Sequence, residues 1–112
     1  EKVAAMFSPA HPAVLRLVKD IIRTGQRYDV PVSLCGEMAG DPIYTPLLLG
    51  MGLRTFSCSP PAIPEIKKVI RSITLEQALQ VSRQVMSFDN DTETLNYLRM
   101  KARELMPEAY TD

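Results

Sequence analysis

The chain has 112 residues and a mass of 12.5 kDa, which suits one domain or part of one. Hydrophobic residues make up 46% of it and charged residues 23%, a balance typical of globular rather than disordered proteins. Thirteen basic residues balance thirteen acidic ones, so the net charge is zero. This balance argues against a nucleic-acid binder held by bulk positive charge.

The sequence also argues against membrane insertion and secretion. A long stretch without a charged residue lies between Asp41 and Arg54, and prolines and glycines interrupt it. It is too short to span a bilayer. Residues 1–7 show no basic segment followed by an apolar one, so no signal peptide is predicted. Two cysteines do not make a disulfide framework and fit a reducing cytoplasm. Because the chain begins with Glu1 rather than Met, we interpret it as a fragment or a processed product.

The first predicted element is an amphipathic helix of about three turns. It is expected to start at His11 and Pro12, because proline is favourable at a first helical position. We interpret His11 as a helix-start residue. Gly25 is expected to end the helix. Its apolar positions recur at spacings of three and four: Val14, Leu15, Leu17, Val18, Ile21 and Ile22.

Two short apolar segments predict strands. Residues 30–35 do not alternate clearly, which is typical of a buried parallel strand, and residues 54–58 form the second candidate. Between them, the glycines and proline of residues 36–42 predict a loop. Residues 43–49 then predict a short helix that is closed by residues 50–52.

Three more helices are predicted towards the end of the chain. Residues 62–73 have helical spacing, with Lys67, Lys68 and Arg71 expected on a solvated face. Thr74 and Gln77 have the spacing of a capping box for a helix whose apolar side runs through residues 75–86. After a polar break at 89–91, residues 92–106 predict the last helix.

The order of these elements predicts an α/β fold with a parallel sheet. Two strands alone make a sheet that is marginal in water. We therefore expect the sheet to be completed by sequence outside this chain or by another copy of it.

The segment 33–42 is the most informative about chemistry. Cys35 falls at the carboxyl end of a predicted strand and just before a glycine-rich turn. Ligands bind at that end of the strands in parallel α/β sheets and barrels. A thiol there can act as a nucleophile, a metal ligand or an acid, and cysteine is also a common small buried hydrophobe. Position alone leaves these alternatives open.

The run Cys35-Gly36-Glu37-Met38-Ala39-Gly40-Asp41 resembles a motif of the phosphoenolpyruvate-protein phosphotransferases, enzyme I of the bacterial phosphotransferase system. Residues 47–53, 56–59 and 63–71 resemble, in order, the helix, strand and helix that follow in that family. Residues 9–15 resemble the segment upstream. Cys58 departs from the pattern, since the family usually has Met there, and we expect it to be a core or barrel-mouth residue. The resemblance is close over residues 1–73 and looser beyond.

For the fold, the resemblance implies the C-terminal fragment of a (β/α)8 TIM barrel. Residues 1–73 would supply the last two strand–helix units, and residues 74–112 the C-terminal helices. A complete barrel needs about 250 residues, which agrees with the missing strands. The family's barrel binds phosphoenolpyruvate (PEP) and Mg²⁺, and the resemblance places the magnesium ligands upstream of Glu1, with none in this segment.

For function, the resemblance implies a cytoplasmic enzyme of sugar transport or of the nitrogen-linked branch of the same system. It would move the phosphoryl group of PEP to a histidine of a separate domain. The phosphoryl group then passes to the phosphocarrier protein HPr, and pyruvate is released. Cys35 would be the proton donor at the pyruvate-forming carbon. Gly36, Glu37, Gly40 and Asp41 would form the substrate loop. The family's homodimer predicts an exposed apolar face on residues 75–106.

Two alternatives remain. The first is a fragment of the related pyruvate phosphate dikinases or PEP synthases, which share the Cys-Gly pair but differ after it. The second is a non-catalytic helical association module. The fragment itself is expected to be inactive, because the phosphohistidine and metal ligands are upstream. Its expected partners are PEP or pyruvate, HPr and a second copy, with no nucleic acid and no membrane insertion.

Overall fold

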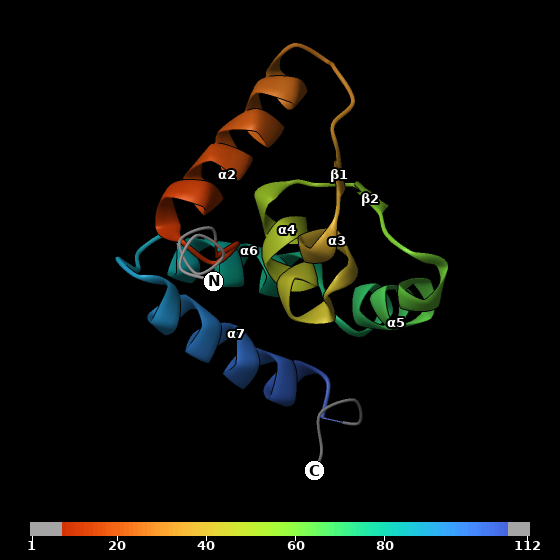
Figure 1. Ribbon diagram of the computed structural model, residues 1–112, viewed down its shortest axis with the longest axis vertical. Helices are drawn as coiled ribbons and strands as arrows, with labels where there is room; N and C mark the ends of the chain where they lie inside the picture. The colour runs from red at the N-terminus through yellow and green to blue at the C-terminus, as the bar shows by residue number, and fades with distance from the viewer. Residues whose placement is uncertain (1–7, 108–112) are drawn as a thin grey trace.

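The computed structural model describes residues 8–107, which form helices and a two-stranded parallel sheet (Figure 1). The strands are β1 (Ser33–Cys35) and β2 (Thr55–Ser57), and Cys35 lies opposite Ser57 in their register. The predicted α/β character and parallel pairing are confirmed. The predicted first strand, 30–35, is too long, because Val30 N–H donates to Gly25 O at 2.7 Å and Pro31 has no N–H for the ladder.

Helix α2 (Pro12–Arg27) begins as predicted. His11 caps it, with Nδ1 accepting a hydrogen bond from Ala13 N at 3.1 Å. The prediction that Gly25 ends the helix is wrong, because the helix continues to Arg27 and Gly25 is buried within it. A Cβ there would collide with the Val32 side chain and lie 2.8 Å from Val30 O. This glycine therefore allows close packing of the chain that follows the helix.

The prediction of a loop at residues 36–42 is also wrong. This stretch forms the short helix α3 (Glu37–Gly40) and starts the 3-10 helix η1 (Pro42–Tyr44). Asp41 caps the start of η1, and its Oδ1 accepts a hydrogen bond from Ile43 N at 3.1 Å. Helix α4 (Thr45–Met51) follows and ends, as predicted, at a glycine, since Gly52 has a left-handed φ of 107°.

The C-terminal half is helical, as predicted. The Thr74 capping box is confirmed, with Thr74 Oγ1 accepting from Gln77 N at 3.1 Å and Gln77 Oε1 accepting from Thr74 N at 2.9 Å. In the predicted polar break, Asn90 Oδ1 caps the last helix by accepting from Glu93 N at 2.9 Å. The elements are the 3-10 helix η2 (Pro60–Ala62), α5 (Ile63–Ser72), α6 (Leu75–Val85) and α7 (Asp91–Leu105).

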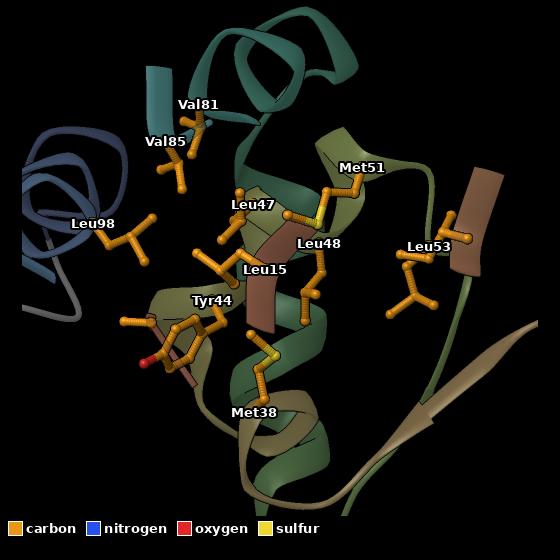
Figure 2. Close-up of a cluster of buried hydrophobic side chains, with 12 residues drawn as sticks. Leu15, Met38, Tyr44, Leu47, Leu48, Met51, Leu53, Val81, Val85 and Leu98 are labelled. Carbon is orange, nitrogen blue, oxygen red and sulfur yellow. The ribbon is translucent and has the colours of Figure 1, made fainter. Parts of the chain in front are cut away.

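Helix α4 supplies the centre of the core. It contacts α2, α5 and α6, and Figure 1 shows it near the middle of the view. Leu47 and Leu48 are fully buried and lie beside Leu15 of α2 in Figure 2. Val81, Val85 and Leu98 close the same cluster from α6 and α7. Burying a leucine contributes about 1.5–3 kcal/mol, so this cluster is a main source of the stability that holds the helices together.

The two faces of the sheet differ. Leu34 and Phe56 are half-buried and pack against the core. The residues before and after each of them are exposed, so the other face of the sheet is open. Within the described part of the chain, the predicted buried strand is therefore covered on one face only. The open face carries Ser33, Cys35, Thr55 and Ser57.

Some residues of the predicted apolar faces are exposed rather than buried. Leu75 and Leu79 of α6 are 58% and 44% exposed, and Met100 of α7 is 48% exposed. The periodicity predicted the helices correctly, but it assigned to their buried sides some residues that the described part of the chain leaves exposed. Large exposed apolar side chains thus lie within residues 75–106, the segment in which the family resemblance predicts an apolar face.

Candidate functional site

A cavity of about 630 Å³ lies at the carboxyl ends of β1 and β2. Its walls come from the end of β1, helix α3, the start of η1 and the segment that joins β2 to η2. The structure brings all five sequence-predicted site residues together at this cavity: Cys35, Gly36, Glu37, Gly40 and Asp41.

Cys35 is the last residue of β1, and its side chain is exposed. Because side chains alternate along a strand, Cys35 points away from the core-facing Leu34 and onto the open face of the sheet. The thiol is free and borders the cavity. It is therefore accessible to a small molecule that enters from the open face.

Gly36 turns the chain from β1 into α3. Its φ of 99° and ψ of −165° belong to a region that only glycine adopts readily. No atom lies within 4 Å of where a Cβ would stand, so backbone conformation, rather than space, requires glycine here. Gly36 O accepts a hydrogen bond from Gly40 N at 3.3 Å, which closes the turn of α3.

The two acidic residues of the motif differ in their surroundings. Glu37 is exposed in the first turn of α3. Asp41 is half-buried, and its carboxylate is engaged with Ile43 N. Among residues 8–107 there is no group of three or more His, Cys, Asp or Glu side chains that could hold a metal ion.

Cys58 and Ser57 border the same cavity from the other strand. Cys58 is half-buried against α3, since a Cβ on Gly40 would lie 3.4 Å from Cys58 Cβ. Its place at the cavity agrees with the predicted position at the mouth. Sequence reasoning missed Ser57, whose place opposite Cys35 follows only from the register of the two strands.

Tyr44 links the motif to the core. Burial raises the pKa of the Tyr44 phenol above its usual value of 10.0, and the nearby Asp41 carboxylate adds to the rise. The phenol thus stays neutral in ordinary buffers. Since Tyr44 ends η1 and packs in the main hydrophobic cluster, it anchors the segment that Asp41 begins.

A second cavity, of about 390 Å³, borders the Asp41–Ile43 segment and shares Asp41 and Pro42 with the first. Val69 and Met106 give it an apolar wall, and Glu65 and Lys68 also line it.

Lys67, Lys68 and Arg71 are exposed, as the sequence predicts. Among residues 8–107, no helix is both long enough and apolar enough to cross a membrane.

Comparisons with known proteins agree with this arrangement. The family model described as PEP-utilising enzyme, PEP-binding domain, matches residues 1–75. The chain is 46% identical over 101 residues to a phosphoenolpyruvate-protein phosphotransferase of Cupriavidus necator, with 90% of the chain covered. It is 35% identical over 99 residues to the protein of that name from Geobacillus stearothermophilus, and 42% identical over 78 residues to that of Haemophilus influenzae. These matches cover 88% and 70% of the chain.

The chain spans only a small part of these relatives. It covers 17% of the length of the Cupriavidus necator and Geobacillus stearothermophilus proteins and 14% of that of Haemophilus influenzae. The matches take in the cavity and all five candidate residues, because the family model extends from residue 1 to residue 75.

Proposed function

We propose a role for Cys35 because this chain belongs to the family of PEP-utilising enzymes. Cys35 is the proton donor that completes pyruvate formation in a phosphoenolpyruvate-protein phosphotransferase. The observation that carries the proposal is the exposed thiol at the carboxyl end of β1, bordering a cavity of about 630 Å³. Ligands bind at this end of parallel strands in barrels and open sheets.

The chemistry suits a thiol. Loss of the phosphoryl group from PEP leaves the enolate of pyruvate, and protonation of its methylene carbon gives pyruvate. Thiols ordinarily have a pKa of about 8.5 and are mostly protonated at neutral pH, whereas a carboxyl group is ordinarily ionised. Cys35 would donate its S–H proton to that carbon and regain a proton from solvent.

We assign Gly36, Glu37, Gly40 and Asp41 to the substrate loop. Gly36 supplies a backbone turn that places α3 directly beside the thiol. Asp41 fixes the start of η1 through Ile43 N and so sets the wall between the two cavities. These contacts support positioning roles for the loop.

We further propose that the fold is the C-terminal fragment of a TIM barrel, with residues 1–73 as the last two strand–helix units and 74–112 as C-terminal helices. Parallel pairing of β1 and β2 supports this, as does the division of the sheet into an apolar face under the helices and an open polar face. In a barrel, the helices cover the outer face of the sheet, and the open face would point inward.

The whole protein would transfer the phosphoryl group of PEP to an enzyme histidine and on to an HPr-type phosphocarrier, in the cytoplasm, as part of sugar transport. That histidine and the magnesium ligands would lie outside this chain. Mg²⁺ would supply charge stabilisation for the phosphoryl group and the enolate, while the chain's own part is to deliver the proton and shape the loop.

A homodimer is part of the same proposal. Leu75, Leu79 and Met100 are large apolar side chains with exposed fractions of 58%, 44% and 48%. Apolar residues of this kind support an interface with a second copy. A non-catalytic association module remains the alternative function, and it rests on these same residues. A dikinase or PEP synthase fragment remains the alternative family member.

The experiment uses the full-length enzyme that contains this segment. Cys35→Ser and Cys35→Ala are expected to lower the rate of pyruvate release about 100-fold or more, the scale of general acid catalysis, while PEP still binds. Ser33→Ala, on the same face of β1 but outside the cavity, is the matched control and should keep its rate. Unchanged turnover in both Cys35 variants would exclude the proposed role.

A further inference from the structure

We propose that Cys35 and Cys58 form a reversible disulfide at the cavity when a peroxide reaches them. The chain has two cysteines, and both border the same cavity as free thiols. The expected loss of proton donation rests on the proposed function of Cys35, whereas the formation of the disulfide does not.

The strand register brings the two residues close. Cys35 lies opposite Ser57, and Cys58 is the next residue along the chain. Neighbouring strands are about 4.8 Å apart and rise about 3.3 Å per residue, so regular strand geometry continued by one residue would separate the two Cα atoms by about 6 Å. Disulfides span Cα distances of roughly 4.4 to 6.8 Å.

Both residues line the cavity, and the local backbone does not hold the two side chains apart by strand alternation. Strand β2 ends at Ser57, so the alternation of a strand does not fix the direction of the Cys58 side chain. Cys58 lies against Gly40 in α3, the helix that begins two residues after Cys35. Nothing lies within 4 Å of the position that a Cβ on Gly36 would take, so there is open space beside Cys35.

The difference in exposure assigns a role to each thiol. Cys35 is exposed and would meet the oxidant first, while Cys58 is half-buried. The Cys35 thiolate attacks one oxygen of hydrogen peroxide, the O–O bond breaks, and Cys35 sulfenic acid and one water form. The Cys58 thiolate then attacks the sulfenic sulfur, the S–S bond forms, and the second water leaves. Two thiols lose two electrons and two protons, and the peroxide is reduced to two waters.

Formation of the bond would switch off proton donation, because Cys35 no longer carries an S–H. A dithiol reductant would restore both thiols by exchange through a mixed disulfide. Cys58 stands where the resembling family usually has Met, so the inference concerns this chain and not the family as a whole.

The first test uses the 112-residue chain at low concentration. After treatment with hydrogen peroxide and blocking of the remaining thiols, digestion without reductant should yield one peptide pair joined through Cys35 and Cys58. The free thiols should fall from two per chain to none, and the pair should separate on reduction. The same treatment in urea should yield much less of the pair. A product containing only singly oxidised cysteines, or only bonds between chains, would overturn the proposal.

The second test separates this proposal from the proposed function. In the full-length enzyme, each variant is compared with its own activity before peroxide. The wild type should lose pyruvate formation and regain it with dithiothreitol, while Cys58→Ser should not show the reversible loss. If the disulfide forms and turnover continues, the proton-donor role fails and the thiol pair stands. If Cys35→Ser is inactive and no disulfide forms, the thiol pair fails and the proton-donor role stands.

Discussion

Gly50 and Ala78 lie against each other where α4 meets α6. A Cβ on Gly50 would stand 2.7 Å from the carbonyl carbon of Ala78 and 2.9 Å from Ser82 Cβ. The absence of a side chain at Gly50 therefore allows the two helices to approach at backbone distance. This approach seals the core, because Leu47 and Leu48 of α4 are fully buried beside it.

Gly50→Ala is expected to lower the free energy of unfolding, although alanine favours a helix by about 1 kcal/mol over glycine. Overpacking of a close contact costs about 1–3 kcal/mol, and the contact is with backbone, which does not move aside easily. Urea denaturation of the chain measures the change. Gly40→Ala is the control, because its nearest neighbour would be at an ordinary 3.4 Å. Equal stability of both variants would contradict the account.

Gly36→Ala tests backbone strain rather than space. The residue has a φ of 99° with no neighbour within 4 Å of a Cβ position, so the whole cost comes from the conformation. We expect a loss of about 1–3 kcal/mol in unfolding free energy, or a rearranged turn beside Cys35. Denaturation measures the first, and the reactivity of the Cys35 thiol with a chromogenic disulfide measures the second. Wild-type values for both would show that the turn is not constrained.

Two buried threonines offer a matched comparison. Thr45 is fully buried, and within residues 8–107 its hydroxyl has no hydrogen-bond partner. Thr94 is equally buried, but its hydroxyl donates to Asn90 O at 3.3 Å. Thr45→Val should be neutral or raise the unfolding free energy by about 1 kcal/mol, whereas Thr94→Val should lower it by about 1 kcal/mol. The reverse order in thermal or urea unfolding would contradict this assignment.

The Tyr44 phenol predicts a loss of stability at high pH. Burial first, and the Asp41 charge second, raise its folded-state pKa above 10.0, so folding disfavours the phenolate. The neutral phenol's contribution to the free energy of unfolding is fully present below the unfolded-state pKa of about 10. It is lost as the pH rises through the folded-state pKa. Urea unfolding across this range should show falling stability, with a shallower fall in Tyr44→Phe. An identical fall in both proteins would exclude Tyr44 as a source.

Local patterns in the sequence predicted several features, because neighbouring residues decide them. The Thr74 capping box involves residues three apart, and Gly52 ends α4 by its own backbone freedom. Gly25 was misassigned because glycine also serves close packing, and only the distant Val32 decides between the two uses. Helix α3 has four residues, too few for a periodic pattern to predict it.

The site was predictable in part for the same reason. Cys35 could be placed at a strand end because an apolar run stops there and a glycine follows. Ser57 and Cys58 join the cavity only through the pairing of β2 with β1, which no local pattern encodes. The open polar face was missed because strands of three residues are too short to display alternation.

The central claim is that the Cys35 thiol carries a proton to and from the methylene carbon of the enolate. The most direct measurement is exchange of the methyl hydrogens of pyruvate with D₂O, followed by proton NMR with the full-length enzyme. Wild type and Ser33→Ala should replace these hydrogens with deuterium far faster than buffer alone, and Cys35→Ser should exchange at the buffer rate. Wild-type exchange in Cys35→Ser would contradict the account.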